Sequence, residues 1–385
     1  MRVILIAMKD TAKRPEIQSI LIQLVSVWGP SLLATVWRTR SWQLAMLAAK
    51  RRRKRVLKRE GLVVPFGIGI SPTMRCNLSC SGCYARFHSK EEEMPREVID
   101  CLIGEASKAG VFLFVITGGE PYMREEMLDI YRKYSSSLFI TVSNGSLFTD
   151  HLVGEIKKAG NILPILSIEG FAEHTDKRRG LGVHEKVLEA MGRLKAAKML
   201  FGFSSVLSKD AIETLGSDSF VSDMVKRGAT VGFYNDFVPI SKDDEGLVPD
   251  DEEMTAFRSR LSKLRSRHPI VLLHLPDDEY DENGRCTAVK DGAVHVNAQG
   301  DVEPCPFAHF ALENVKRNTF RDILRSPFLE AIRRHPSALT KCGTGCSLSS
   351  KQELLCELAA QSGARSTDSK SSQPITTIPD GPASN

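Results

Sequence analysis

Six short apolar runs, each separated from the next by an amphipathic stretch, constrain the fold of this chain more than any other feature. The runs lie at 66–73, 112–117, 138–143, 162–168, 200–207 and 230–238. Short runs of this kind, bounded by turn residues, are typical of buried strands, and the stretches between them have helical spacing. Regular alternation of strands and helices predicts parallel βαβ units. Six such units predict an α/β fold, a partial (β/α)6 TIM-like barrel that stays open, unlike the closed barrel of eight units.

The rest of the chain divides around this barrel. We expect a basic, amphipathic helical arm at 1–64, the barrel at 65–240, a connector at 241–285 with a helix at 251–267, a cysteine-containing region at 286–360 and a tail at 361–385. The tail lacks aromatic residues and is rich in Ser, Thr and Pro, so we expect it to be disordered.

The amino-terminal arm favours contact with a membrane surface. Residues 17–37 carry no charge, but Gly29–Pro30 interrupts them and predicts two short helices instead of one span. The second helix leads into 50–59, which carries eight basic residues. Such a helix is typical of an anionic membrane interface, where it would bring the barrel mouth near a hydrophobic substrate. The alternatives are an arm packed on the barrel or on a partner subunit, and a true span.

The charge distribution argues against nucleic acid as a partner. Without the run at 50–59, the net charge of +5 becomes −3. The basic character is therefore local, and a broad nucleic-acid surface is not expected.

Cysteine usage indicates metal chemistry in a reducing compartment. The chain has nine cysteines, an odd number, and its first apolar run is too short for a signal peptide. We therefore expect a cytoplasmic protein, peripheral on the inner face of the membrane, with grouped cysteines as metal ligands. Cys101 stands alone in a helical pattern and is expected to be a buried, inert thiol.

Three of these cysteines form an incomplete ligand set. Cys76, Cys80 and Cys83 are spaced C-x3-C-x2-C directly after the first predicted strand, at the end of the barrel where active sites lie. A closed zinc or iron–sulfur site needs four protein ligands. Three thiolates instead leave one iron of a 4Fe–4S cluster with an open coordination position, where a cofactor or substrate can bind.

With the turns that follow the next strands, this loop resembles the radical S-adenosylmethionine (radical SAM) superfamily. The turns are "TGGEP" at 117–121, "SNG" at 143–145, "SIEG" at 167–170 and "DKRRG" at 176–180. The resemblance implies that the open iron chelates the amino and carboxylate groups of S-adenosylmethionine (SAM). An electron, from a reductant such as flavodoxin or ferredoxin, then splits SAM into methionine and a 5′-deoxyadenosyl radical that abstracts hydrogen from a substrate.

The resemblance also assigns SAM contacts. It places the SAM ammonium at Gly118, Gly119 and Glu120, and the ribose and carboxylate near Ser143, Asn144, Ser167, Glu169 and Arg179. The family usually has an aromatic residue directly before the third cysteine. This chain has Gly82 there, and Tyr84 after the cysteine is taken as the aromatic cofactor contact. No catalytic residue beyond the cluster is assigned.

The second cysteine group resembles the SPASM and Twitch extensions of radical SAM enzymes. Its members are Cys286, Cys305, Cys342 and Cys346, with a predicted hairpin at 293–305. The resemblance implies one auxiliary iron–sulfur cluster, which binds substrate or carries an electron; Cys356 is a spare or replaces Cys342. A structural zinc site is the alternative, because four thiolates also suit zinc.

The sequence therefore predicts a radical SAM enzyme with a small C-terminal iron–sulfur-binding extension. Its amino terminus favours a lipid or other membrane-held substrate. Modification of a peptide or protein is the alternative, although residues 1–64 do not resemble the winged peptide-binding domain that such enzymes often carry. A non-enzymatic iron–sulfur scaffold is the third hypothesis, and the intact SAM motifs argue against it.

Overall fold

The computed structural model of the chain describes residues 40–87, 93–240, 242–341 and 346–368. Its centre is a nine-stranded sheet in the order β7-β6-β5-β4-β3-β2-β1-β8-β9. Seven consecutive strands run parallel, and they are β1 (Gly67–Ile70), β2 (Leu113–Ile116), β3 (Leu138–Ser143), β4 (Ile162–Ser167), β5 (Gly202–Leu207), β6 (Val231–Asp236) and β7 (Val271–Leu275). All six predicted strands are confirmed.

The seventh strand was not predicted. Residues 271–275 lie in the segment expected to be an irregular connector, yet they pair in parallel with β6 over Val231–Asn235. The preceding helix α11 (Asp251–Arg267) coincides with the predicted one and begins at a capping box formed by Asp250 and Glu253. The barrel sheet therefore has one more parallel strand than expected.

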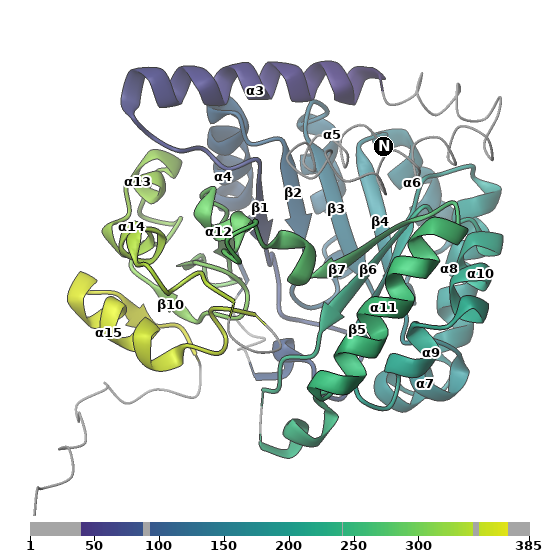
Figure 1. Ribbon diagram of the computed structural model, residues 1–385. Coiled ribbons are helices and arrows are strands. Elements are labelled where there is room, and N and C mark those ends of the chain that lie inside the picture. The colour runs from purple at the N-terminus through teal and green to yellow at the C-terminus, as the bar shows by residue number, and fades with distance from the viewer. Residues whose placement is uncertain (1–39, 88–92, 241, 342–345, 369–385) are drawn as a thin grey trace, which may run out of the picture.

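Helices cover the outer face of this sheet (Figure 1). They are α4 (Arg96–Ala109), α5 (Met127–Lys133), α6 (Asp150–Ala159), α7 (Ala172–Arg179), α8 (Val183–Ala196), α9 (Ile212–Leu215), α10 (Asp218–Arg227) and α11. Gly110 and Gly160 end α4 and α6 in the left-handed conformation. After each of these two helices, a short turn leads directly into the next strand, β2 or β4.

The amino-terminal helix α3 (Arg40–Glu60) crosses the end of the barrel where the strands begin (Figure 1). Met46 and Ala49 are buried in one cluster with Phe112, Leu138 and Val271 from the starts of the sheet strands. The Arg53 guanidinium donates to the Gly110 carbonyl at 2.7 Å. The packed-arm alternative thus holds for residues 40–60, whereas the uncharged stretch 17–37 lies outside the described residues.

The C-terminal extension continues the barrel sheet beyond β1. Strand β8 (His295–Val296) pairs in parallel with β1 and turns back into β9 (Val302–Glu303), which confirms the predicted hairpin. The remaining elements are α12 (Thr287–Lys290), β10 (Phe310–Ala311), α13 (Phe320–Leu324), α14 (Pro327–Arg334), α15 (Gln352–Ser362) and β11 (Arg365–Ser366). Because β11 pairs with β10, the expectation that the chain is disordered from 361 was wrong for this part of the tail.

Candidate active site

The loop that carries Cys76, Cys80 and Cys83 is held by the turn after β2. The Gly119 amide donates to the Thr73 carbonyl at 2.9 Å, and the Glu120 amide donates to the Arg75 carbonyl at 2.8 Å. Gly118 has φ of +100°, a conformation that favours glycine. The two glycines therefore allow close backbone contact between the turn and the cysteine loop.

Cys76 accepts two N–H contacts at its sulfur. The Leu78 amide lies 3.5 Å from Sγ, and the Asn144 side-chain amide lies 3.7 Å from it. Burial raises the pKa of the Cys76 thiol, and these two donors oppose that rise. Asn144 also donates to the Asn77 side chain at 2.8 Å, so the end of β3 is fixed against the cysteine loop. The predicted residue Asn144 thus lies beside Cys76, one of the predicted cluster ligands.

The Glu120 carboxylate is fully buried and engaged within the protein. It accepts hydrogen bonds from Ser143 Oγ at 2.8 Å, from the Asn144 amide at 2.8 Å and from the Tyr122 amide at 3.2 Å. Burial raises its pKa, and the three donors counteract the effect. Glu120 therefore ties the turn after β2 to the end of β3, and its contact with SAM stays a prediction.

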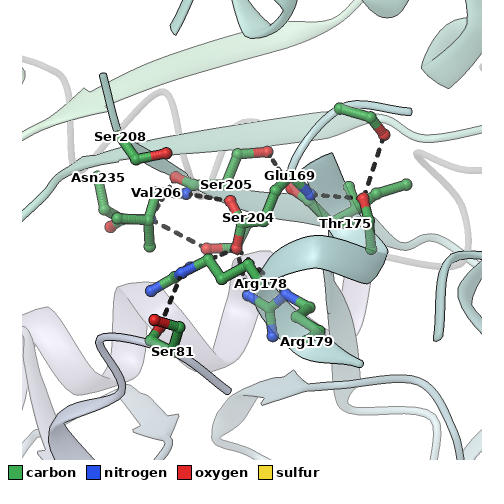
Figure 2. A network of polar contacts seen from close by, with 12 residues as sticks. Ser81, Glu169, Thr175, Arg178, Arg179, Ser204, Ser205, Val206, Ser208 and Asn235 are labelled. Atoms are coloured by element: carbon green, nitrogen blue, oxygen red, sulfur yellow. Dashed lines mark hydrogen bonds and ion pairs between the residues drawn. The ribbon is translucent and has the colours of Figure 1, made fainter. Parts of the chain in front are cut away.

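Glu169 forms the centre of a second polar group (Figure 2). One oxygen accepts from Arg178 and from Arg179, each at 2.5 Å, and the other accepts from the Val206 amide at 2.8 Å. Burial alone would raise the pKa of Glu169, but the two guanidinium groups hold it below its usual value. Two cations against one carboxylate leave a local excess of positive charge.

This positive group lies against the cysteine loop. Arg178 donates through Nε to the Ser81 carbonyl at 3.3 Å, and the Ser81 amide donates to the Arg178 carbonyl at 2.8 Å. Burial raises the pKa of Cys80, while Arg179 and then Arg178 lower it. Positive charge at this position suits thiolate ligands and an anionic cofactor group. Arg178 was missed by the sequence analysis, which selected Arg179 alone from the adjacent pair.

Tyr84 begins a short 3-10 turn (Tyr84–Phe87) directly after Cys83. Its hydroxyl accepts from the Gly118 amide at 3.0 Å and lies 3.3 Å from Thr117 Oγ1. Tyr84 therefore joins the third cysteine to the Gly-Gly turn. Ser167 lies at the end of β4, in register with Ser204 of β5. The roles of Tyr84 and Ser167 in SAM binding stay predictions.

The second cysteine group assembles in the extension. Cys305 and Cys346 hydrogen-bond through their side chains, and this contact lowers the pKa of Cys346 below its usual value. Cys286 is buried and interacts electrostatically with Cys346. Cys342 lies outside the described residues and Cys356 lies on α15, so the choice between these two ligands stays a prediction.

The thiolates fit an iron–sulfur cluster, because N–H groups contact the Cys76 sulfur and two arginines lie near Cys80. In the described ranges, no three His, Cys, Asp or Glu side chains are gathered closely enough for one metal ion. A cubane cluster binds each thiolate through a different iron, so its ligands stand farther apart than those of a single ion.

The eight described cysteines are all free of disulfide bonds. Cys101 is exposed on α4, so the expectation of a buried thiol was wrong.

Comparisons with known proteins agree with these two sites. A model of the radical SAM superfamily matches residues 70–209, and a model of the SPASM iron-sulfur cluster-binding domain matches residues 286–347. The AdoMet-dependent heme synthase of Methanosarcina barkeri is 24% identical over 302 residues, which cover 70% of this chain and 85% of the synthase.

Two further proteins are similar over most of the chain. The sporulation killing factor maturation protein SkfB of Bacillus subtilis is 27% identical over 276 residues, covering 68% of this chain and 65% of SkfB. The crystal structure of Streptococcus suis SuiB bound to the precursor peptide SuiA has a TM-score of 0.61 at 16% identity, covering 77% of this chain and 75% of SuiB. At this level of identity, the similarity to SuiB concerns the fold alone. The family models, the relatives and the fold together show that this chain belongs to the radical SAM superfamily, as an enzyme with a SAM-binding 4Fe–4S cluster and a C-terminal SPASM domain that binds auxiliary iron–sulfur clusters.

Proposed function

We propose that this enzyme modifies a peptide or protein, and that the membrane is at most its place of attachment. The names of the similar proteins favour this substrate class, since SkfB is a maturation protein and SuiB was crystallised with a precursor peptide. The heme synthase makes a tetrapyrrole the second candidate. A lipid substrate, favoured above from the amino terminus, has no support among these three proteins.

The observation that carries the proposal is the change in polarity along the inside of the barrel. Near the strand starts, the inward side chains are apolar, as in the cluster that contains Met46 and Phe112. Strand partners in register share one face of the sheet. At the carboxyl ends this inward face carries polar residues, which are Ser71, Thr117, Ser167, Ser204 and Asn235.

These polar groups suit a peptide better than an acyl chain. Asn235 Nδ2 donates to Ser204 Oγ at 3.0 Å and lies in the same region as Glu169 (Figure 2). An acyl chain would offer the remaining donor and acceptor positions of such groups no hydrogen-bond partner, which costs free energy. A peptide brings its own donors and acceptors. When bound, the cluster and SAM supply the radical that takes hydrogen from a substrate carbon; the residues above hold the loops and the substrate around it.

The position of α3 makes attachment to a membrane a separate question from whether the substrate is a lipid. The outer face of α3 exposes Leu44, Leu47 and Leu57 among basic residues, so we still propose contact with an anionic membrane. However, α3 covers the strand starts (Figure 1), whereas the loop with Cys76, Cys80 and Cys83 follows the carboxyl end of β1, at the opposite end of the barrel. The expectation that the arm brings the barrel mouth to the bilayer is therefore abandoned. No helix within the described ranges is long and apolar enough to cross a membrane.

Deuterium transfer to 5′-deoxyadenosine tests the proposal and does not require the substrate to be identified first. Peptide, lipid and tetrapyrrole fractions are prepared from deuterated cells and incubated separately with reduced enzyme and unlabelled SAM. We expect deuterium in 5′-deoxyadenosine, measured by mass spectrometry, only with the peptide fraction. The enzyme with Cys76, Cys80 and Cys83 replaced by Ala is the control and should transfer none. Transfer from the lipid or tetrapyrrole fraction alone would overturn the proposal.

A further inference from the structure

A chain of buried polar side chains connects the SPASM hairpin to the SAM site. On β9, Glu303 Oε2 lies 2.8 Å from His295 Nδ1 of β8. His295 Nε2 lies 2.8 Å from Ser71 Oγ at the end of β1. Glu303, His295 and Ser71 are between 0% and 2% exposed, so no water separates them from one another at these distances. Ser71 also hydrogen-bonds the side chain of Tyr84, whose hydroxyl accepts from the Gly118 amide.

Glu303 is the hydrogen-bond acceptor at the SPASM end of this series of side chains. Glu303 also accepts from Asn297 Nδ2 at 3.2 Å and from Thr367 Oγ1 at 2.5 Å, so its carboxylate acts only as an acceptor. His295 then donates through Nδ1 to Glu303, and this contact turns Nε2 of the same ring toward the Ser71 hydroxyl. The Ser71 hydroxyl also hydrogen-bonds the side chain of Tyr84. The Glu303 carboxylate thus sets the orientation of the His295 ring that faces Ser71.

We propose that Glu303, His295 and Ser71 are positioning residues through which the SPASM hairpin orients Tyr84 and so fixes the Gly118 turn relative to the Cys83 end of the cluster loop. Glu303 lies two residues before Cys305, and Tyr84 directly follows Cys83. The chain therefore runs from the auxiliary site to the SAM site. The inference concerns this geometry and holds for any of the substrates considered above.

Attachment of the hairpin does not require these side chains. Backbone hydrogen bonds already join it to β1, from the Gly69 amide to the Val294 carbonyl and from the Ser71 amide to the Val296 carbonyl, each at 2.8 Å. Ala298 at the hairpin turn adds apolar packing against Met74 and Ala85. Buried polar side chains stabilise a fold less readily than apolar ones of similar size, but they impose direction on their partners. Here that direction leads to Tyr84.

Substitutions at three positions in the reconstituted full chain test the proposal. Ser71→Ala and Tyr84→Phe each remove one oxygen from the chain, and Thr367→Val removes a contact to the other oxygen of Glu303. We measure the dissociation constant of SAM, the change that SAM causes in the electron paramagnetic resonance (EPR) spectrum of the reduced protein, the iron content and the melting temperature.

The expected result separates positioning from general stability. Ser71→Ala and Tyr84→Phe should each weaken SAM binding about two- to tenfold and alter the SAM-dependent EPR change, with iron content retained. The variant that combines Ser71→Ala and Tyr84→Phe should bind SAM no more weakly than whichever single variant binds it less tightly. The reason is that both residues act through the same series of hydrogen bonds. Thr367→Val should bind SAM like the wild type. Ser71→Thr keeps the hydroxyl and should therefore restore the SAM affinity that Ser71→Ala loses. Unchanged SAM binding in Ser71→Ala, additive effects, or a loss of iron and folding with no specific SAM defect would each overturn the proposal.

Discussion

Gly119 lies against the backbone of Arg75 so closely that a Cβ atom on Gly119 would be 1.9 Å from the Arg75 carbonyl oxygen. That oxygen also accepts a hydrogen bond from the Glu120 amide, so the contact lies where the turn after β2 meets the cysteine loop. The family resemblance explains this glycine by access to SAM. The structure adds that the cysteine loop itself needs it.

Gly119→Ala should therefore displace the cysteine loop and impair the first cluster. We expect the variant to retain about four of about eight irons, with the auxiliary cluster intact. Iron analysis and EPR spectroscopy of the reconstituted protein measure this. Gly154→Ala is the matched control, because a Cβ there meets no atom within 4 Å. In a helix that change should stabilise the protein by about 0.5–1 kcal/mol. A Gly119→Ala protein with full iron would contradict the account.

Glu169→Gln should destabilise the protein strongly, because it leaves two buried guanidinium groups without a counter-charge. Breaking a buried ion pair in this way costs about 3–5 kcal/mol. Urea unfolding of the cluster-free protein at pH 7 measures the loss. Glu173→Gln, on the exposed side of α7, is the control and should have little effect.

The same variant predicts a pH dependence. The folded pKa of Glu169 lies below its usual value of 4.5, so its contribution is present above that value and is lost as the pH falls through the folded pKa. The difference in unfolding free energy between wild type and Glu169→Gln should therefore shrink as the pH is lowered below 4.5. A difference that grows on acidification would show that Glu169 is not held ionised.

Helix α3 should be required for folding. Met46 is 2% exposed within the barrel cluster, whereas Leu44 on the same helix is 60% exposed. Met46→Ala should cost about 2–5 kcal/mol and Leu44→Ala less than about 0.5 kcal/mol, measured by urea unfolding. A chain that begins at residue 61 should aggregate or melt at a much lower temperature. If that chain folds normally and cleaves SAM, α3 is a dispensable attachment.

The outer face of α3 should bind anionic vesicles. It exposes Lys50, Arg51, Lys54, Arg55, Lys58 and Arg59, and within the described ranges none of the six is in an ion pair. Vesicles that contain phosphatidylglycerol should bind the full chain, and salt should weaken binding, since screening acts over about 10 Å at 0.1 M. Replacement of four of these cations by Gln should abolish binding with the fold intact. Equal binding to neutral vesicles, or none to either kind, would exclude this surface.

The parts of the fold that sequence predicted best are those specified locally. The six strands and the helix at 251–267 follow from apolar runs, caps and spacing, and the cysteine loop and its turns follow from motif residues. Strand β7 was missed although Pro269 and Pro276 lie on either side of "VLLHL", because this short apolar run is embedded in a charged segment that was assigned as a connector. Its assignment depends on backbone pairing with β6, a tertiary contact.

The parts that could not be predicted depend on contacts between distant residues. Ser71 and His295 are 224 residues apart in the sequence, and no local pattern connects them. The three donors that engage Glu120 include two from the end of β3. For α3, a basic helix with apolar residues suits both a membrane and a barrel end, and tertiary contacts such as the packing of Met46 and Ala49 distinguish the two.

The metal content of the reconstituted protein tests the central claim most directly. The account places an open 4Fe–4S cluster on Cys76, Cys80 and Cys83 and an auxiliary cluster in the SPASM domain. It predicts about eight irons in the wild type and about four after all three residues are changed to Ala. Only the wild type should show an EPR change on addition of SAM. Full iron in the triple variant, or zinc as the metal that remains, would contradict the account.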